Sequence, residues 1–270
     1  HFNEERILYG AEQAENDVYM AKKWGFVADN TKAPGGVAHG LVLWLDADDS
    51  SNVSTADCTA AVAAPSDGNS LGCWKDKSGK GNHLSDNGTV TYETGELNGR
   101  PAILFNNGSV NLTGLNGMSG ADNPFTVFMV FDKTSNSAEA TLLNYGLQGG
   151  DNTQKWSFTT ESDGDLSNTW HTNKVSTSDT PINVLGKPFV GTMNYEGGGV
   201  GNNSFHNIYV NGAKKVTAGG SGTTAAAVST MNIAIGRAFN NGQPHYGHIA
   251  EVVMYDRLLS DAERQDVEAY

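Results

Sequence analysis

Aspartates gather at two places in the chain where their carboxylates could bind a cation. Calcium prefers several hard oxygen ligands on loops that bring them together. Neither group has the spacing of an EF-hand loop, so solvated turn aspartates remain the alternative for both. The two groups that predict calcium sites are Asp46, Asp48 and Asp49 with Asp76 returning beside them, and Asp163 with Asp165.

Aromatic and amide side chains suggest a second kind of chemistry, the recognition of a sugar. An aromatic face stacks on the apolar side of a pyranose, and amides and carboxylates match its hydroxyls. Two stretches offer these groups, residues 239–246 and the region around position 170. A simple turn is the alternative for the first stretch, and Trp44 and Trp156 are expected in the core. The candidate ligand-binding residues are Asn240, Asn241, Gln243, His245, Tyr246, Trp170 and His171.

Catalytic patterns are weak. Retaining glycoside hydrolysis needs two carboxylates about 5 Å apart on one face. The nearest approach is Glu161 with Asp165, but the Ser-Asp-Gly-Asp stretch that ends at Asp165 is typical of a turn. The chain has no HExxH signature, no Gly-x-Ser-x-Gly elbow and no Cys/His zinc spacing. We therefore predict no catalytic residue, and keep a divergent glycoside hydrolase or lyase acting through Glu161 and Asp165 as a lesser alternative.

The amino-acid composition limits the kinds of molecule that this protein is expected to bind. The 270 residues include 30 Asp and Glu against 17 Lys and Arg, for a formal charge of −13. This balance disfavours binding to nucleic acid or to an anionic membrane. The 33 glycines against 7 prolines predict a turn-rich chain, and its length is compatible with one large β domain.

The two cysteines and the lengths of the apolar runs indicate in which cellular environment the protein is expected. Cys58 and Cys73 are able to form one disulfide in an oxidising environment, and two buried reduced thiols are the alternative. The longest apolar run, residues 125–131, is too short to span a bilayer. No signal peptide precedes His1, so we expect a processed or trimmed chain.

The first thirty residues carry the one sustained helical pattern. Apolar residues recur at spacings of four and three over residues 2–24. This predicts an amphipathic helix, either packed across the main domain or serving as a stalk, followed by a turn-rich linker at residues 28–36. The apolar positions are Ile7, Ala11, Ala14, Val18 and Ala21.

The part of the chain that follows the linker predicts about a dozen short strands, a number that suits an antiparallel two-sheet jelly roll. Residues 125–131 alternate little, as expected of a strand covered on both faces. Residues 249–255 predict a buried closing strand. Ser260 with Glu263 then forms the capping-box signature of a short C-terminal helix.

This closing strand and helix resemble those of bacterial laminin G-like modules in the concanavalin A-like lectin and glucanase superfamily. The resemblance rests on Gly247, Glu251, Tyr255, Arg257 and Glu263, and recurs in upstream runs such as GLVLWLDA, WKDKSGKGN and NGRPAILFN. It covers about residues 37–270. It implies an antiparallel jelly-roll sandwich whose surface loops bind glycans or proteins, often with calcium. Residues 2–24 are also similar, more weakly, to the amphipathic half of a type IV pilin-like helix.

We therefore divide the chain into a helical extension with its linker (residues 1–30) and a laminin G-like domain (residues 37–270). The leading hypothesis is a non-catalytic, extracellular or cell-surface lectin-type adhesion module, assisted by Ca²⁺, with a glycan or surface-protein ligand. The alternative is the globular head of a pilin-like subunit that meets other pilus or appendage subunits through its N-terminal helix.

Overall fold

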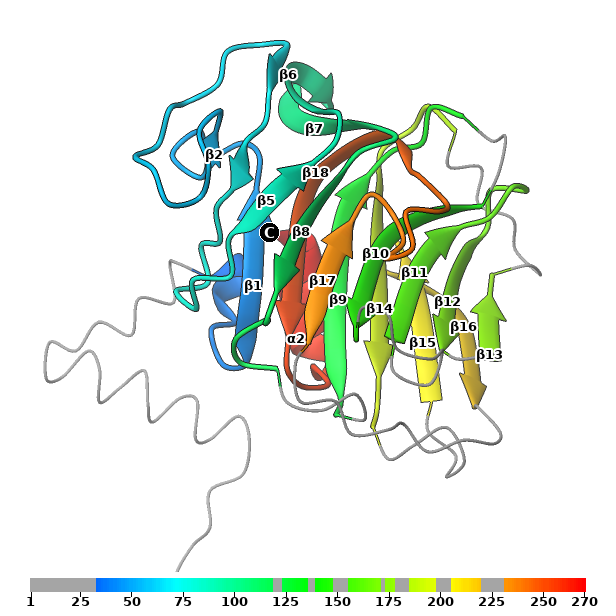
Figure 1. Ribbon diagram of the computed structural model, residues 1–270. Coiled ribbons are helices and arrows are strands. Elements are labelled where there is room, and N and C mark those ends of the chain that lie inside the picture. Colours follow the sequence, from blue (N-terminus) through cyan, green and yellow to red (C-terminus); the bar gives the residue numbers. More distant parts are fainter. Residues whose placement is uncertain are drawn as a thin grey trace, which may run out of the picture.

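A computed structural model shows the architecture of the larger part of the chain (Figure 1). The expected N-terminal helix lies outside the described residues, so the division into extension and domain stays a prediction. Among the residues described, no helix is long and apolar enough to cross a membrane. The structure describes residues 33–118, 123–135, 139–147, 155–170, 173–177, 185–197, 205–219 and 231–270.

Sheet 1 is a nine-stranded antiparallel layer with β18 (Tyr246–Tyr255) near its middle. One edge of β18 pairs with β9 over most of its length, and its other edge pairs first with β7 and then with β1. The predicted closing strand is therefore confirmed. The other strands, in spatial order, are β16 (Ala213–Gly219), β15 (Phe205–Val210), β14 (Phe189–Tyr195), β9 (Phe125–Phe131), β7 (Arg100–Asn106), β6 (Val90–Leu97) and β3 (Asn69–Ser70), with β1 (Leu41–Asp46) beside β18.

Sheet 2 is a second nine-stranded antiparallel layer stacked on the first (Figure 1). The long segment between positions 50 and 73 is built into both layers, because β2 pairs in sheet 2 and β3 pairs in sheet 1. Val53 and Leu71 from it are buried because they face the core. The strands of sheet 2 are β13 (Asn173–Ser176), β12 (Leu166–Trp170), β11 (Lys155–Thr160), β10 (Ala140–Gly146), β17 (Asn232–Ile235), β8 (Ser109–Thr113), β5 (Leu84–Asn87), β4 (Cys73–Trp74) and β2 (Val53–Ser54).

Aromatic side chains from both sheets form the centre of the core. The ring of Phe125 in sheet 1 lies 5.2 Å from the ring of Trp156 in sheet 2 and 5.5 Å from that of Tyr145. Tyr195 packs on Trp156 with 4.6 Å between ring centroids. Tilted and edge-on rings at these separations attract one another in addition to the area they bury. The predicted two-sheet sandwich, with Trp156 in its core, is confirmed.

The outer face of sheet 1 is covered by two helical segments, η2 (Pro34–Gly36) and α2 (Asp261–Ala269). Val267 of α2 packs with Trp44 and Phe128, which point outward from β1 and β9. The Ser260 capping box is present and confirms the predicted start of this helix. β9 is thus buried on both faces, as its continuous apolar run predicted.

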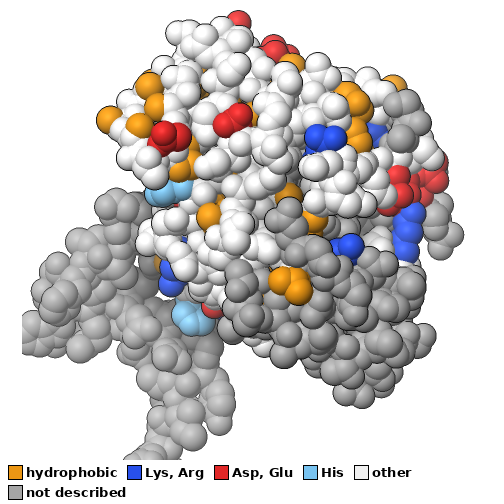
Figure 2. Space-filling model, viewed as in Figure 1, with side chains coloured by type: hydrophobic (Ala, Val, Ile, Leu, Met, Phe, Trp, Pro, Cys, Tyr) orange, Lys and Arg blue, Asp and Glu red, His pale blue; other side chains and the backbone are white. Residues whose placement is uncertain are grey.

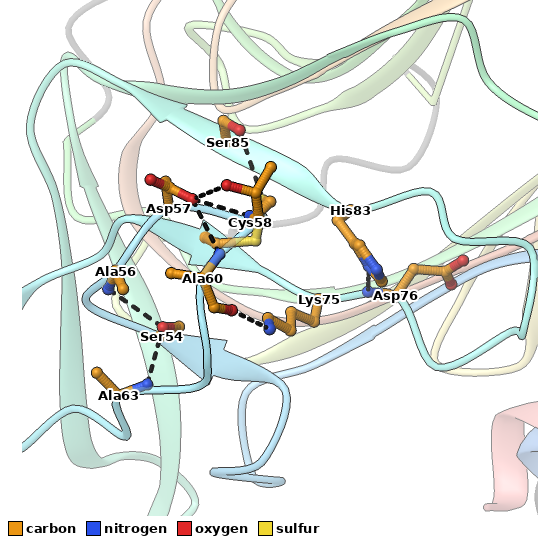
Figure 3. The surroundings of a disulfide bond; sticks show 12 residues. Ser54, Ala56, Asp57, Cys58, Ala60, Ala63, Lys75, Asp76, His83 and Ser85 are labelled. Atoms are coloured by element: carbon orange, nitrogen blue, oxygen red, sulfur yellow. Dashed lines mark hydrogen bonds between the residues drawn. A yellow bond between two sulfur atoms is a disulfide. The ribbon is translucent and has the colours of Figure 1, made fainter.

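The disulfide between Cys58 and Cys73 is present (Figure 3), so the alternative of two reduced thiols is wrong. The chain between the two cysteines folds back on itself through local hydrogen bonds. The carboxylate of Asp57 accepts from the backbone N–H of Ala60 at 3.0 Å, and the hydroxyl of Ser54, which precedes the loop, accepts from the backbone N–H groups of Ala56 and Ala63. Closing a loop of this length contributes about 3 kcal/mol in the chain-entropy model.

A half-buried carboxyl group lies beside the covering helix. Glu251 of β18 accepts a hydrogen bond from the indole N–H of Trp44 at 2.8 Å. Burial raises the pKa of Glu251 to about 7, the neighbouring Asp46 adds to the rise, and the Trp44 hydrogen bond opposes it. Because the folded-state pKa lies above the unfolded value of 4.5, the folded state holds this proton more tightly than the unfolded state.

The raised pKa of Glu251 leads to a prediction for the variant Glu251→Gln. As pH rises from 4.5 to 7, the unfolded wild type loses the proton first, so the wild type should lose stability relative to the variant by up to about 3 kcal/mol. Glutamine keeps an acceptor for Trp44 but does not titrate. Urea unfolding of both proteins at pH 5 and pH 8 measures the difference, and parallel pH dependences would show that Glu251 titrates normally.

Candidate functional site

The outer face of sheet 2 is a polar surface. On β11 the side chains of Trp156 and Phe158 point into the core, so Ser157 between them and Thr159 after them lie on the outer side of the sheet. Ser157 pairs across the strands with Thr169 of β12. Strand alternation thus brings short hydroxyl side chains together on a rigid layer.

Asn144 connects this face to the loop that follows β17. Its amide nitrogen donates to the carbonyl oxygen of Trp156 at 2.7 Å and to the hydroxyl of Ser157. Its amide oxygen accepts from the backbone N–H of Phe239 at 3.1 Å. The side chain of Asn144 therefore places Phe239 over the middle of the sheet.

The loop at positions 237–245 is held by its own hydrogen bonds as well. Arg237 donates to the carbonyl oxygen of Asn241 at 2.8 Å, and Ala238 and Gly242 pair through their backbones at 3.2 Å. The backbone N–H of Thr141 on β10 donates to the carbonyl oxygen of Gln243 at 2.8 Å.

Two non-glycine residues of this loop are in the left-handed region, Asn241 with φ 62° and Gln243 with φ 49°. Such conformations cost energy and persist only where the surroundings enforce them. The loop is therefore a fixed part of the surface.

Phe239 separates two hollows on this face. One has a volume of about 220 Å³ and the other about 80 Å³, and Phe239 contributes to the wall of both. In Figure 2 most of the described surface is white, the colour of the backbone and of uncharged polar side chains, with separate red and blue groups among it. The larger hollow is lined by Asn144, Lys155, Ser157, Thr169, Ala238, Phe239, Asn240 and Gln243, and the smaller by Asn87, Asn111, Leu112, Thr113, Asn232, Ile233, Ala234, Ala238, Phe239 and Asn241.

The predicted ligand-binding residues divide into two groups. Asn240 and Gln243 line the larger hollow, and Asn241 lines the smaller one. His245 has no exposed surface and packs against Phe105, and burial lowers its pKa to about 4. Its placement in the core contradicts its expected role at the surface, because a neighbouring turn carries the chain back into the sandwich.

The remaining predicted ligand residues do not contribute to these walls. Tyr246 is half-buried at the start of β18 and lines neither hollow. The backbone of Trp170 ends β12, and its side chain lies outside the described part of the chain, as does the whole of His171.

The first group of predicted calcium ligands has partners within the protein. The ammonium of Lys77 lies between Asp46 and Asp49, at 2.7 and 3.1 Å, and Arg100 pairs with Asp48. Asp76 instead accepts backbone N–H bonds at the turn after β4, including one from Trp44 of β1 at 2.9 Å. These four carboxylates do not form one of the compact metal-ligand groups in the described part of the chain, and calcium binding by them stays a prediction.

The second acidic group belongs to a turn. The backbone N–H of Glu161 donates to the carbonyl oxygen of Asp165 at 2.8 Å, and Asp163 accepts from the backbone of Asp165. Glu161 itself pairs with Lys174 and accepts from Ser167. None of these three carboxylates lines either hollow, so the arrangement differs from a pair of acids that flank a cleft, and calcium binding by Asp163 and Asp165 stays a prediction.

The residues that shape the larger hollow include several that the sequence reasoning did not single out, Asn144 and Phe239 above all. A polar amide in the middle of an otherwise apolar stretch, TLLNYGL, was the available signal for Asn144. For Phe239 the signal was an aromatic residue next to an Asn-Asn-Gly turn.

A two-sheet sandwich with a polar outer face and a rigid loop across it defines a lectin-like β-sandwich. The sequence profile of the family described as the Concanavalin A-like lectin/glucanases superfamily matches residues 105–263. The chain belongs to this family. The predicted laminin G-like relationship is confirmed. No curated protein matches the chain.

Several solved structures share the fold at low sequence identity. Domain 4 of AbnA, an extracellular arabinanase from Geobacillus stearothermophilus solved with arabinotriose, is 16% identical with a TM-score of 0.56, covering 84% of this chain and 98% of that domain. Trypanosoma rangeli sialidase is 14% identical with a TM-score of 0.57, covering 96% of this chain and 39% of the enzyme.

The receptor-binding domain of botulinum neurotoxin mosaic serotype C/D is 15% identical with a TM-score of 0.56, covering 86% of this chain and 51% of that one. At these identities the likeness establishes the fold. Carbohydrate-binding modules and glycoside hydrolases both use this fold, so the fold does not separate them.

Asn144 generates a prediction for stability. The variant Asn144→Ala leaves the N–H of Phe239 and the carbonyl of Trp156 without this partner, which should lower the free energy of unfolding by about 1–3 kcal/mol. Hydrogen exchange at the Phe239 amide should also accelerate. Asn111→Ala is the matched control, because the side-chain oxygen of Asn111 on β8 has no hydrogen-bond partner among the described residues. Equal losses in both variants under urea unfolding would contradict the assigned role.

Proposed function

We propose that this chain is a carbohydrate-binding module that holds a glycan on the outer face of sheet 2. The observation that carries the proposal is the position of Phe239, an aromatic ring on a rigid loop between two polar hollows. Stacking on an aromatic face and hydrogen bonds from neighbouring amides are the two interactions that a pyranose needs.

The surroundings of Phe239 match sugar hydroxyls. Amide groups are offered by Asn240 and Gln243, and hydroxyls by Ser157 and Thr169. These groups both donate and accept hydrogen bonds, as sugar hydroxyls do. Lys155 is the charged residue of the larger hollow, and it can donate to a ring oxygen or to an acidic substituent.

We propose binding without hydrolysis because none of the described residues that line the two hollows is Asp or Glu. Retaining and inverting hydrolysis both need a pair of carboxylates at the scissile bond. The AbnA domain supports glycan recognition on a related fold, since it was solved in complex with arabinotriose.

An extracellular or cell-surface location completes the proposal. A disulfide such as Cys58–Cys73 persists in oxidising environments and is rare in the cytosol. The AbnA domain belongs to an extracellular enzyme. Assistance by Ca²⁺ is tested by comparing binding with and without EDTA.

The test of this function is a glycan array probed with the whole chain, with and without EDTA, followed by calorimetry on the best ligand. Phe239→Ala should weaken binding about tenfold or more, because a stacked ring contributes on the order of 1 kcal/mol beyond the apolar area it buries. Tyr270→Ala is the control. It removes an aromatic side chain that is 62% exposed and packs on Trp44, on the opposite face.

Each outcome of this experiment bears on the proposal. A ligand lost with Phe239 and kept in the Tyr270 variant supports the site on sheet 2. The proposal would be contradicted if no glycan on the array bound the chain with or without EDTA. It would also be contradicted if Phe239→Ala bound the ligand as tightly as the wild type.

A further inference from the structure

A compact group of metal-ligand atoms lies on the outer face of sheet 1, away from the proposed glycan site. It consists of Glu93 and Glu96 of β6 and His248 of β18, whose ligand atoms all lie within 4.8 Å of one another. The Nε2 atom of His248 is 3.1 Å from Oε2 of Glu93 and 3.8 Å from Oε2 of Glu96. β7 runs between the two strands, so the group joins residues that are not neighbours in the sheet.

The imidazole is oriented from behind by a buried carboxylate. Oδ1 of Asp132 accepts from the backbone N–H of His248 at 2.7 Å and lies 3.1 Å from its Nδ1. Both residues are less than a tenth exposed. Gly247 allows this approach, since a Cβ there would lie 2.6 Å from the carbonyl oxygen of Asp132. A metal-binding histidine usually donates the N–H of its other ring nitrogen to a carboxylate or carbonyl oxygen, which fixes the orientation of the ring.

The charges around His248 are unbalanced. Three carboxylates, those of Asp132, Glu93 and Glu96, surround one imidazole. Within the part of the chain that the structure describes, no Lys or Arg pairs with either glutamate. Even a protonated imidazole leaves two negative charges in a half-buried place, where like charges repel. A divalent cation would balance them.

We propose that Glu93, Glu96 and His248 bind a divalent transition-metal cation, with Zn²⁺ as the best fit, and that Asp132 orients the histidine for it. A tetrahedral zinc ion about 2.1 Å from each ligand separates the ligand atoms by about 3.4 Å. The two distances from Nε2 to the glutamate oxygens bracket this value. Calcium fits less well because it takes six to eight oxygen ligands, whereas imidazole nitrogen suits zinc and its neighbours.

Such an ion would have a structural effect. It would tie β6 to β18 across β7, at a place where the register of β6 shifts between Glu93 and Leu97. The two cysteines are joined in a disulfide, so they do not compete for the metal under oxidising conditions. The site is on the opposite outer face from Phe239, and the inference does not rest on the proposed function.

The test is a titration of the EDTA-treated, dialysed whole chain with ZnCl₂ alone, followed by calorimetry and by thermal unfolding. We expect one strong equivalent per chain and a higher Tm with zinc. Glu93→Gln and Glu96→Gln should each weaken binding at least about tenfold, and Asp132→Asn by about 10–100-fold. Asp86→Asn, which changes an exposed carboxylate on β5, should bind zinc like the wild type.

Glu96 makes the test robust to misfolding, because its side chain is 42% exposed and its substitution should leave the fold intact. Zinc binding that persists unchanged in Glu96→Gln and Glu93→Gln would overturn the proposal, as would a wild type that takes up no stoichiometric zinc. Calcium in excess should not displace the zinc, because calcium prefers oxygen ligands to imidazole nitrogen. Displacement would overturn the choice of a transition metal for this site.

Discussion

The structure depends on the placement of one strand, β18, between three others. Its backbone pairs with β9 on one side and with β7 and then β1 on the other, so segments from the beginning, middle and end of the chain are joined in a single ladder. Buried backbone N–H and C=O groups need hydrogen-bond partners. A central strand finds these partners along both of its edges. Gly247 allows the close approach of β18 to Asp132, because a Cβ at position 247 would lie 2.6 Å from the carbonyl oxygen of Asp132.

Sheet pairing also gives the molecule two different outer faces. On sheet 1, β18 runs directly into α2, and the helix covers apolar side chains that point outward from β1 and β9. On sheet 2 the outward positions of β10, β11 and β12 carry amides and hydroxyls instead. A covered apolar face stabilises the fold, whereas an open polar face on a rigid layer is available for recognition.

Burial decides the chemistry of individual side chains more than their type does. Glu251 and Glu161 are both glutamates at sheet surfaces, but Glu251 lies beside a helix against Trp44 and has a raised pKa, while Glu161 pairs with Lys174. The same contrast separates His245, which is enclosed among core side chains, from His248, which lies among three carboxylates. The two histidines are only three positions apart in the chain, but one is enclosed in the core and the other faces acidic side chains.

Local patterns in the sequence determined much of the fold. The capping box at Ser260 and the uninterrupted apolar run of β9 each depend on neighbours in the chain, and both are present as predicted. The tertiary structure alone decided which side chains meet.

Asn144 and Phe239 are 95 positions apart, and Glu93 and His248 are 155 apart. Their contacts follow from strand order and from the face on which each residue emerges. No local pattern encodes that order, because antiparallel strands with similar apolar alternation can pair in many ways until the whole core excludes all but one.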